Sequence, residues 1–197
     1  MPTLAPTPKD LGDPGSPDSW QLHDLFDRAF PFNSPSELLL RERNTDFPVA
    51  GLLPCVETGE ITQAQWLLYT ATCLNGQISN GGFDQFLGNC PGLVMDADEM
   101  LALLAPSELV IAYQDAAGPT MTVIRAARER GEGGTHRTEL HTLWQDLKAS
   151  EGHDNTAVFE KINQWIFKMD DNPPNPAGVY VSAVLRELKL NLNELFR

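Results

Sequence analysis

The residues best suited to chemistry in this chain are four histidines, three cysteines and 27 acidic side chains. His136 and His141 are five positions apart, which places them about 140° apart around a helix of 3.6 residues per turn. A zinc pair on a helix needs i, i+4 spacing, as in H-E-x-x-H, so these two residues do not form one. His23 lies in the first expected helix and His153 in a polar turn, where solvated surface histidines are the simplest interpretation.

The other signatures of catalysis and cofactor binding are also absent. Cys55, Cys73 and Cys90 are odd in number, widely spaced and without a C-x-x-C pair, which favours free thiols in a reducing compartment. No G-x-S-x-G or P-loop occurs, and Gly81-Gly82 follows an expected helix rather than a strand. We therefore predict no catalytic residue, no cofactor and no metal, and a protein that is not an enzyme.

The acids Asp96, Asp98 and Glu99 loosely suggest a cation site. They lack the D-x-[DN]-x-[DN]-G run and the distal glutamate of a calcium loop. A helix start enriched in acids explains them better, because carboxylates favour the positive end of the helix macrodipole. We expect Asp96 or Asp98 to cap the helix that follows.

Charge restricts the class of partner. The net charge of −13 and pI near 4.6 oppose direct binding to nucleic acid or to an anionic membrane, and would steer cationic partners toward the protein. General solubility of an acidic bacterial protein is the alternative interpretation. Neither a signal peptide nor a run of 18 apolar residues is visible, so the expected location is cytoplasmic, with no membrane span.

Negative charge is unevenly distributed along the chain. Residues 44–124 contain nine acids and no Lys or Arg, whereas Arg125, Arg128, Arg130 and Arg137 follow closely. This pattern predicts a continuous negative surface that could meet a partner. The candidate acidic binding face comprises Glu57, Glu60, Asp84, Asp96, Asp98, Glu99, Glu108 and Asp115.

Hydrophobic spacing predicts an all-α domain of about seven to nine helices over residues 18–197, after a flexible Pro-rich tail at 1–17. Prolines and glycines make residues 44–60 a connecting loop, and Thr62 should open a long apolar helix. Gly118-Pro119 should break or kink a later helix. Residues 158–169 form an amphipathic stripe, and residues 181–195 make the last helix.

Residues 75–92 stand out from the rest. They predict a helix stop, a tight turn at Asn80-Gly81-Gly82 and a short helix whose Phe83, Phe86 and Leu87 form an apolar wedge in the core. The polar residues around the turn either cap helix ends or recognise a partner or small molecule. These residues are Asn75, Gln77, Asn80, Asp84 and Gln85.

The run NGQISNGGFDQFLGN resembles the hallmark of the DNA-mimic-protein C-terminal-domain family, formerly a domain of unknown function. The resemblance extends from about residue 60 to residue 197. The positions that match the family motif are Asn80, Gly81, Gly82, Phe83, Gln85, Phe86, Asn89 and Gly92.

This resemblance implies an all-helical fold without enzymatic activity, a homodimer in one member, and an acidic surface that imitates duplex DNA and occupies a DNA-binding protein such as a transcription factor or nucleoid protein. The chain departs from the motif at Gln77, where the family tends to carry an acid.

Charge density tests the idea of mimicry. Duplex DNA carries one negative charge per about 1.7 Å of axis, whereas one acid per helical turn gives one per about 5.4 Å. The negative charge along a single helix is therefore too sparse by roughly threefold. Mimicry of DNA needs rows of acidic residues from several helices or from two subunits. Three functions remain open: a DNA mimic, another protein-binding module, and a small-molecule binder or enzyme that uses the polar turn at residues 75–92.

Overall fold

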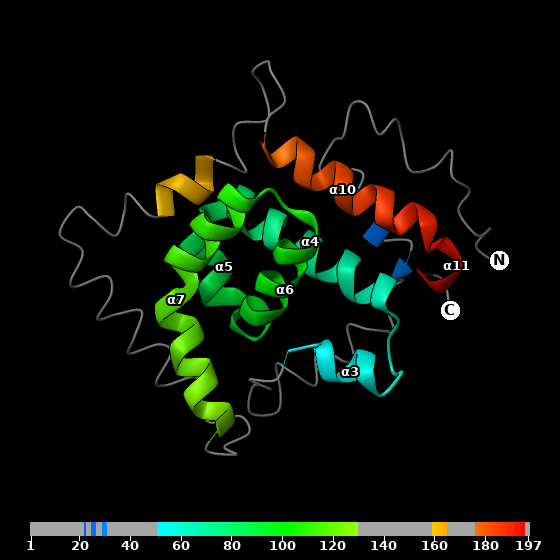
Figure 1. The fold of residues 1–197 in the computed structure, drawn as a ribbon, viewed down its shortest axis with the longest axis horizontal. Coiled ribbons are helices and arrows are strands. Elements are labelled where there is room, and N and C mark those ends of the chain that lie inside the picture. Colours follow the sequence, from blue (N-terminus) through cyan, green and yellow to red (C-terminus); the bar gives the residue numbers. More distant parts are fainter. Residues whose placement is uncertain are drawn as a thin grey trace.

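A computed structural model of the chain describes residues 51–129, 159–164 and 176–195, together with Leu22, Leu25, Phe26, Ala29 and Phe30. All regular structure in these residues is helical and none of them forms a strand, which confirms the predicted all-α class (Figure 1). The expected tail at 1–17 lies outside the described residues. The elements are α3 Leu53–Glu57, α4 Gln63–Gly81, α5 Phe83–Asn89, the 3₁₀ turn η2 Pro91–Leu93, α6 Val94–Leu104, α7 Ser107–Glu129, α10 Pro176–Leu190 and α11 Leu192–Leu195.

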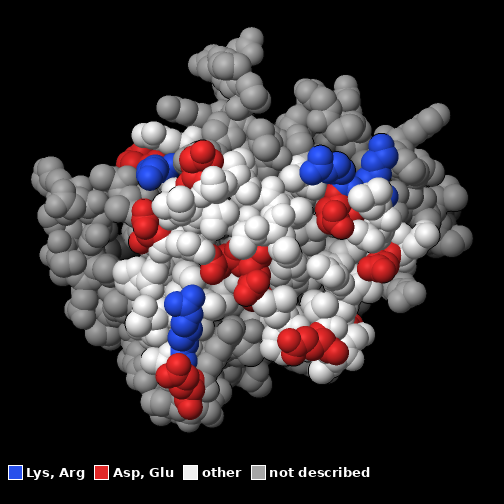
Figure 2. Space-filling view, in the orientation of Figure 1, with Lys and Arg blue, Asp and Glu red and all other residues white. Residues whose placement is uncertain are grey.

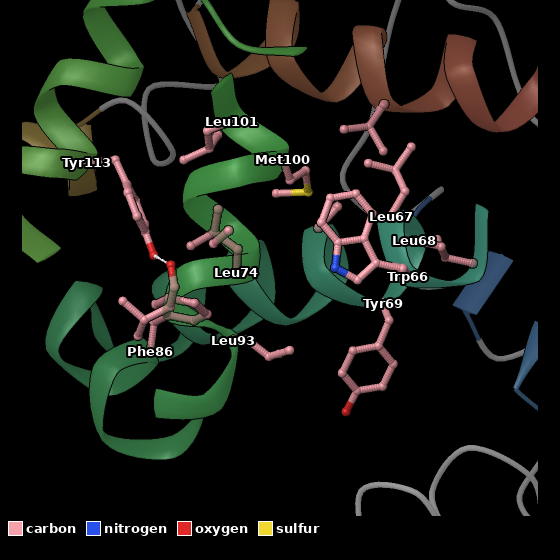
Figure 3. Close-up of a cluster of buried hydrophobic side chains, with 14 of the residues drawn as sticks. Trp66, Leu67, Leu68, Tyr69, Leu74, Phe86, Leu93, Met100, Leu101 and Tyr113 are labelled. Carbon is pink, nitrogen blue, oxygen red and sulfur yellow. Dashed lines mark hydrogen bonds between the residues drawn. The ribbon is translucent and has the colours of Figure 1, made fainter. Parts of the chain in front are cut away.

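The long helix α4 is the centre of the fold and packs against α3, α5, α6, α10 and α11 (Figure 1). It begins as predicted at Thr62, whose hydroxyl accepts a hydrogen bond from the Gln65 backbone N–H while the Gln65 side chain accepts one from the Thr62 N–H. Trp66, Leu68 and Leu74 on this helix are almost completely buried, and Figure 3 shows them between the surrounding helices.

Three boundaries differ from the sequence prediction. The stretch expected to be a loop contains the short helix α3, which Pro54 favours at its first turn. Helix α4 does not stop near Asn75 but continues to Gly81, because Asn75 and Ile78 are buried against the core. Helix α7 runs unbroken through Pro119.

Helices α6 and α7 form a hairpin joined at Ala105 and Pro106. The hydroxyl of Tyr113 on α7 donates a hydrogen bond to the carbonyl oxygen of Val94 at the start of α6, at 2.7 Å, and fixes the pair. Helix α6 begins at Val94 after Leu93, without a side-chain cap. The expectation that Asp96 or Asp98 caps this helix is therefore wrong, since both residues lie inside it.

The carboxyl-terminal helices close the fold beside α4. The expected single last helix is two, α10 and α11, separated at Asn191. Val181, Val184, Leu185 and Leu188 are buried, as their spacing predicts. The Thr62 hydroxyl donates to the carbonyl oxygen of Glu194, so α11 is bound to the first turn of α4.

Two further segments complete the described core. Leu22 and Leu25 are buried, and the rings of Phe26 and Phe30 pack on Tyr69 with centroid distances of 5.3 and 5.7 Å. In the predicted amphipathic stripe at 158–169, Ile162 is buried and Phe159 half-buried; residues 158 and 165–169 lie outside the described part. None of the described helices combines the length and apolar composition that a membrane span requires.

Candidate binding surface

The motif at residues 80–92 builds the sharp elbow between α4 and α5. Gly82 sits at the bend with φ +89° and ψ 178°, a backbone conformation open essentially only to glycine. Its N–H donates to the carbonyl oxygen of Ile78 and closes α4, while its own carbonyl oxygen accepts from the Gln85 N–H and starts α5. The predicted tight turn is therefore present at Gly82. The helix stop predicted near residue 75 is not, because α4 continues to Gly81.

The aromatic residues of the motif are core residues, as predicted. Phe83 and Phe86 are fully buried, and the ring of Phe83 packs edge-on against Tyr113 of α7 and Phe159, both at 5.5 Å between centroids. Figure 3 shows Phe86 and Tyr113 on facing elements of this cluster. The elbow therefore connects α5 to α7 and to the helical segment 159–164.

Two amides of the motif donate hydrogen bonds across the elbow to Gln77, which precedes the motif on α4. The side-chain oxygen of Gln77 on α4 accepts hydrogen bonds from the Gln85 amide at 2.9 Å and the Asn89 amide at 2.7 Å, both on α5. A Cβ at Gly81 would lie 1.9 Å from the Gln85 side-chain oxygen, so this position has no room for a side chain unless Gln85 moves. These contacts give Gln77, Gln85 and Asn89 a structural role in holding two helices at a fixed angle.

The remaining polar candidates around the elbow are divided between core and surface. Asn75 is buried, whereas Asn80 and Asp84 are exposed. Asn163, which the sequence did not single out, accepts a hydrogen bond from the Phe83 N–H at 2.9 Å and so caps α5 from a segment 80 residues away. Nothing in the local sequence indicates that partnership.

Asp96 does not belong to the surface where the sequence placed it. It is fully buried, and one carboxylate oxygen accepts hydrogen bonds from the Trp66 indole at 2.7 Å and from the N–H groups of Leu52 and Leu53 at 3.0 and 3.1 Å. Gly51, at φ +68°, gives the carboxylate room, since a Cβ there would overlap it. Asp96 is therefore an internal anchor for the start of α3 and is removed from the candidate acidic face.

The other seven acids of that face are accessible. Glu57, Glu60, Asp84, Glu99, Glu108 and Asp115 are exposed and Asp98 is half-buried. They come from α3, the turn after it, α5, α6 and α7. The carboxylate of Asp98 on α6 accepts a hydrogen bond from the Gln114 amide of α7 at 2.9 Å, which brings the acids of these two helices into one surface.

Figure 2 shows how these charges are arranged on one face of the molecule. Acidic side chains form separate groups with uncharged surface between them, and Lys or Arg side chains lie beside several of the groups. One group lies over α6, near the middle of this view, and another lies over α3 (Figures 1 and 2). The negative surface on this face is thus divided into separate groups rather than continuous.

The described residues do not bring together three or more His, Cys, Asp or Glu side chains in a geometry that could hold a metal ion. A cavity of about 410 Å³ lies where α4, α6, α10 and α11 meet, and no residue of 75–92 lines it. The polar elbow is therefore not the wall of this cavity.

Comparison with known proteins identifies one family. The model of the DMP19-like protein family matches residues 59–184, which includes α4 to α7 and the elbow motif. Searches of curated proteins and of solved structures gave no significant match.

Proposed function

The chain belongs to the DMP19-like protein family, and from that premise we propose that it is a non-enzymatic protein that binds a DNA-binding protein through exposed carboxylates. The observation that supports this best is the α6–α7 hairpin. It presents Asp98, Glu99, Glu108 and Asp115 to solvent, and the chain contains no Lys or Arg between residues 44 and 124. Such a surface attracts a basic partner and repels nucleic acid itself.

Imitation of duplex DNA is the finer form of this proposal. Acids on one helix are spaced too widely by roughly threefold to match duplex phosphates. The hydrogen bond between Gln114 of α7 and Asp98 of α6 links two helices that carry exposed acids, so the hairpin offers two rows of carboxylates instead of one. A homodimer would add the remaining rows, and it would fit a partner that grips both strands of DNA, such as a transcription factor or nucleoid protein.

The alternative of a small-molecule site or active site at residues 75–92 has less support. Gln85 and Asn89 both donate hydrogen bonds to the side-chain oxygen of Gln77, and Asn75 is buried inside α4. Polar groups already paired in this way hold the elbow instead of offering donors and acceptors to a ligand.

The proposal is tested by capturing partners from the lysate of the native host and then measuring the affinity of the retained protein. We expect a DNA-binding protein that is released by added duplex DNA and by rising salt, since both compete for charge. Glu99→Gln with Asp115→Asn should weaken its binding by about threefold to tenfold.

The matched control is Glu129→Gln with Glu160→Gln, which removes the same charge from exposed positions outside the candidate face. Equal weakening by both pairs would mean that only the net charge matters. A captured partner that resists both salt and duplex DNA would contradict DNA mimicry.

A further inference from the structure

A second polar site lies at the other end of α4, between α6, α10 and α11. Its floor is apolar: Ala64, Trp66 and Leu67 of α4 are buried beneath the cavity of about 410 Å³. Leu103, at the end of α6, lies at its lip with 64% of its surface exposed. This size is within the range of ligand pockets, about 300–1,000 Å³.

The opposite wall of the cavity carries two half-buried carboxylates, Glu187 of α10 and Glu194 of α11. The Asn191 amide donates hydrogen bonds at 3.0 Å to both the side-chain and the backbone oxygen of Glu187, which fixes the orientation of that carboxylate. The described residues that line the cavity include no Lys or Arg. Arg186 and Lys189 are exposed on the same helix but do not line it.

The wall is held in place independently of any ligand. The Thr62 hydroxyl and the Gln65 amide donate to the carbonyl oxygens of Glu194 and Leu195, at 2.9 and 3.4 Å. These bonds occupy the carbonyl groups at the end of α11 and leave the Glu194 carboxylate as the polar group of this helix at the cavity. A preformed site of this kind loses little conformational entropy when a ligand binds.

Two carboxylates above an apolar floor match a cation on an aliphatic chain. The alkyl part would cover Trp66 and Leu103, and the cationic head would form charge-assisted hydrogen bonds with the acids. An anion would be repelled, and a neutral apolar ligand would desolvate the carboxylates without compensation. Glu187 and Glu194 lie beyond residues 59–184, so the two carboxylates are outside the region matched to the family, whereas the apolar floor lies within it.

We propose that this cavity binds an alkyl cation, a guanidinium or primary ammonium group on a short aliphatic chain. The cation is either a free small molecule or an arginine or lysine side chain of a protein. The site is separate from the acidic α6–α7 surface, and its binding does not depend on the function proposed above.

The test is a titration of the full chain with agmatine. NMR spectra monitor the titration through the backbone amide resonances of the residues that line the cavity. Saturable shifts at Gln63, Leu103 and Asn191 are expected, with far weaker binding of the neutral analogue butylurea. Acetyl-arginine amide forms the second arm. If acetyl-arginine amide binds as tightly as agmatine, the site is assigned to a protein side chain. If agmatine alone binds, the site is assigned to a free cation.

The double substitution Glu187→Gln with Glu194→Gln should reduce the affinity for agmatine by about tenfold or more. Each substitution removes one charge-assisted hydrogen bond between a carboxylate and the ligand. Glutamine at 187 can still accept from Asn191, so the fold is preserved. The control pair Glu129→Gln with Glu160→Gln removes the same charge from exposed positions outside both the cavity and the acidic face, and it should leave affinity within about twofold. The substitution Leu103→Ser, at an exposed position, should weaken binding several-fold, because it removes only the apolar contact with the alkyl chain of the ligand.

Three outcomes would overturn the proposal: no saturable binding of agmatine or acetyl-arginine amide, equal binding of butylurea, or equal loss in the control pair. The last result would show general attraction to an acidic protein rather than a site.

Discussion

At the scale of single residues, Asp96 differs from the other described acids in being buried in the core. Its carboxylate accepts from Leu52, which precedes α3, from Leu53 of α3 and from Trp66 of α4, and it is fully buried. Asp96→Ala leaves these donors without their acceptor in the core. We expect a loss of about 3–5 kcal/mol in the free energy of unfolding, measured by urea denaturation.

Two substitutions separate the acceptor role of Asp96 from its charge. Asp96→Asn keeps an oxygen that can accept the same hydrogen bonds and should cost about 1–2 kcal/mol. Asp98→Ala, two residues further on at a half-buried position, should cost less than about 1 kcal/mol. Similar losses at 96 and 98 would contradict the assignment of Asp96 as an internal anchor.

At the scale of elements, the elbow between α4 and α5 depends on one glycine. Gly82 adopts φ +89°, and an added Cβ would also approach the Asp84 carboxylate at 3.1 Å. Gly82→Ala should therefore destabilise the protein by about 1–3 kcal/mol. Gly88, inside α5 with nothing within 4 Å of an added Cβ, provides the control.

Gly88→Ala should stabilise the protein by about 0.4–1 kcal/mol, because alanine lowers the entropy of the unfolded chain and favours the helix. Circular dichroism during thermal unfolding distinguishes opposite shifts in Tm. A loss of stability at 88 as large as at 82 would show that α5 tolerates no added side chain at all, and not that the elbow needs the backbone freedom of glycine.

Local rules predicted those features of the elements that depend on nearby residues. The helix that begins at Thr62, the buried face of α10 and the Phe83–Phe86 wedge all follow from spacings of three and four residues. The family motif likewise indicated the fold. Interactions between distant residues were not visible: Asp96 meets Leu52 across 44 positions, and its neighbour Asp98 looked equivalent in sequence.

Helix ends were mispredicted where packing overrides propensity. Asn75 and Gly76 are typical of a helix end, yet α4 continues because the next turns bury Ile78. Pro119 lacks the N–H that would bind the carbonyl group of Asp115. Both residues are exposed, so water can solvate that carbonyl group and α7 passes through. The cavity at Glu187 and Glu194 gave no sequence signal, because four separate elements build it.

At the scale of the whole molecule, the net charge of −13 should oppose the compact state through self-repulsion. The described exposed cations, Arg125, Lys161, Arg186 and Lys189, all lie outside residues 44–124, where the acids have no basic neighbours in sequence. We therefore expect the Tm to rise as NaCl increases from about 10 to 150 mM, where the Debye length falls from about 30 to 8 Å.

Variants that change the net charge test the same self-repulsion through the Tm. Removing two exposed charges with Glu99→Gln and Asp115→Asn should raise the Tm at low salt and reduce its salt dependence, because less repulsion remains to be screened. Replacing Arg125 with Gln should have the opposite effect, since it removes an exposed cation from α7. A Tm that is independent of salt in all three proteins would mean that the acids are already neutralised within the fold. They would then have no excess charge with which to attract a DNA-binding partner.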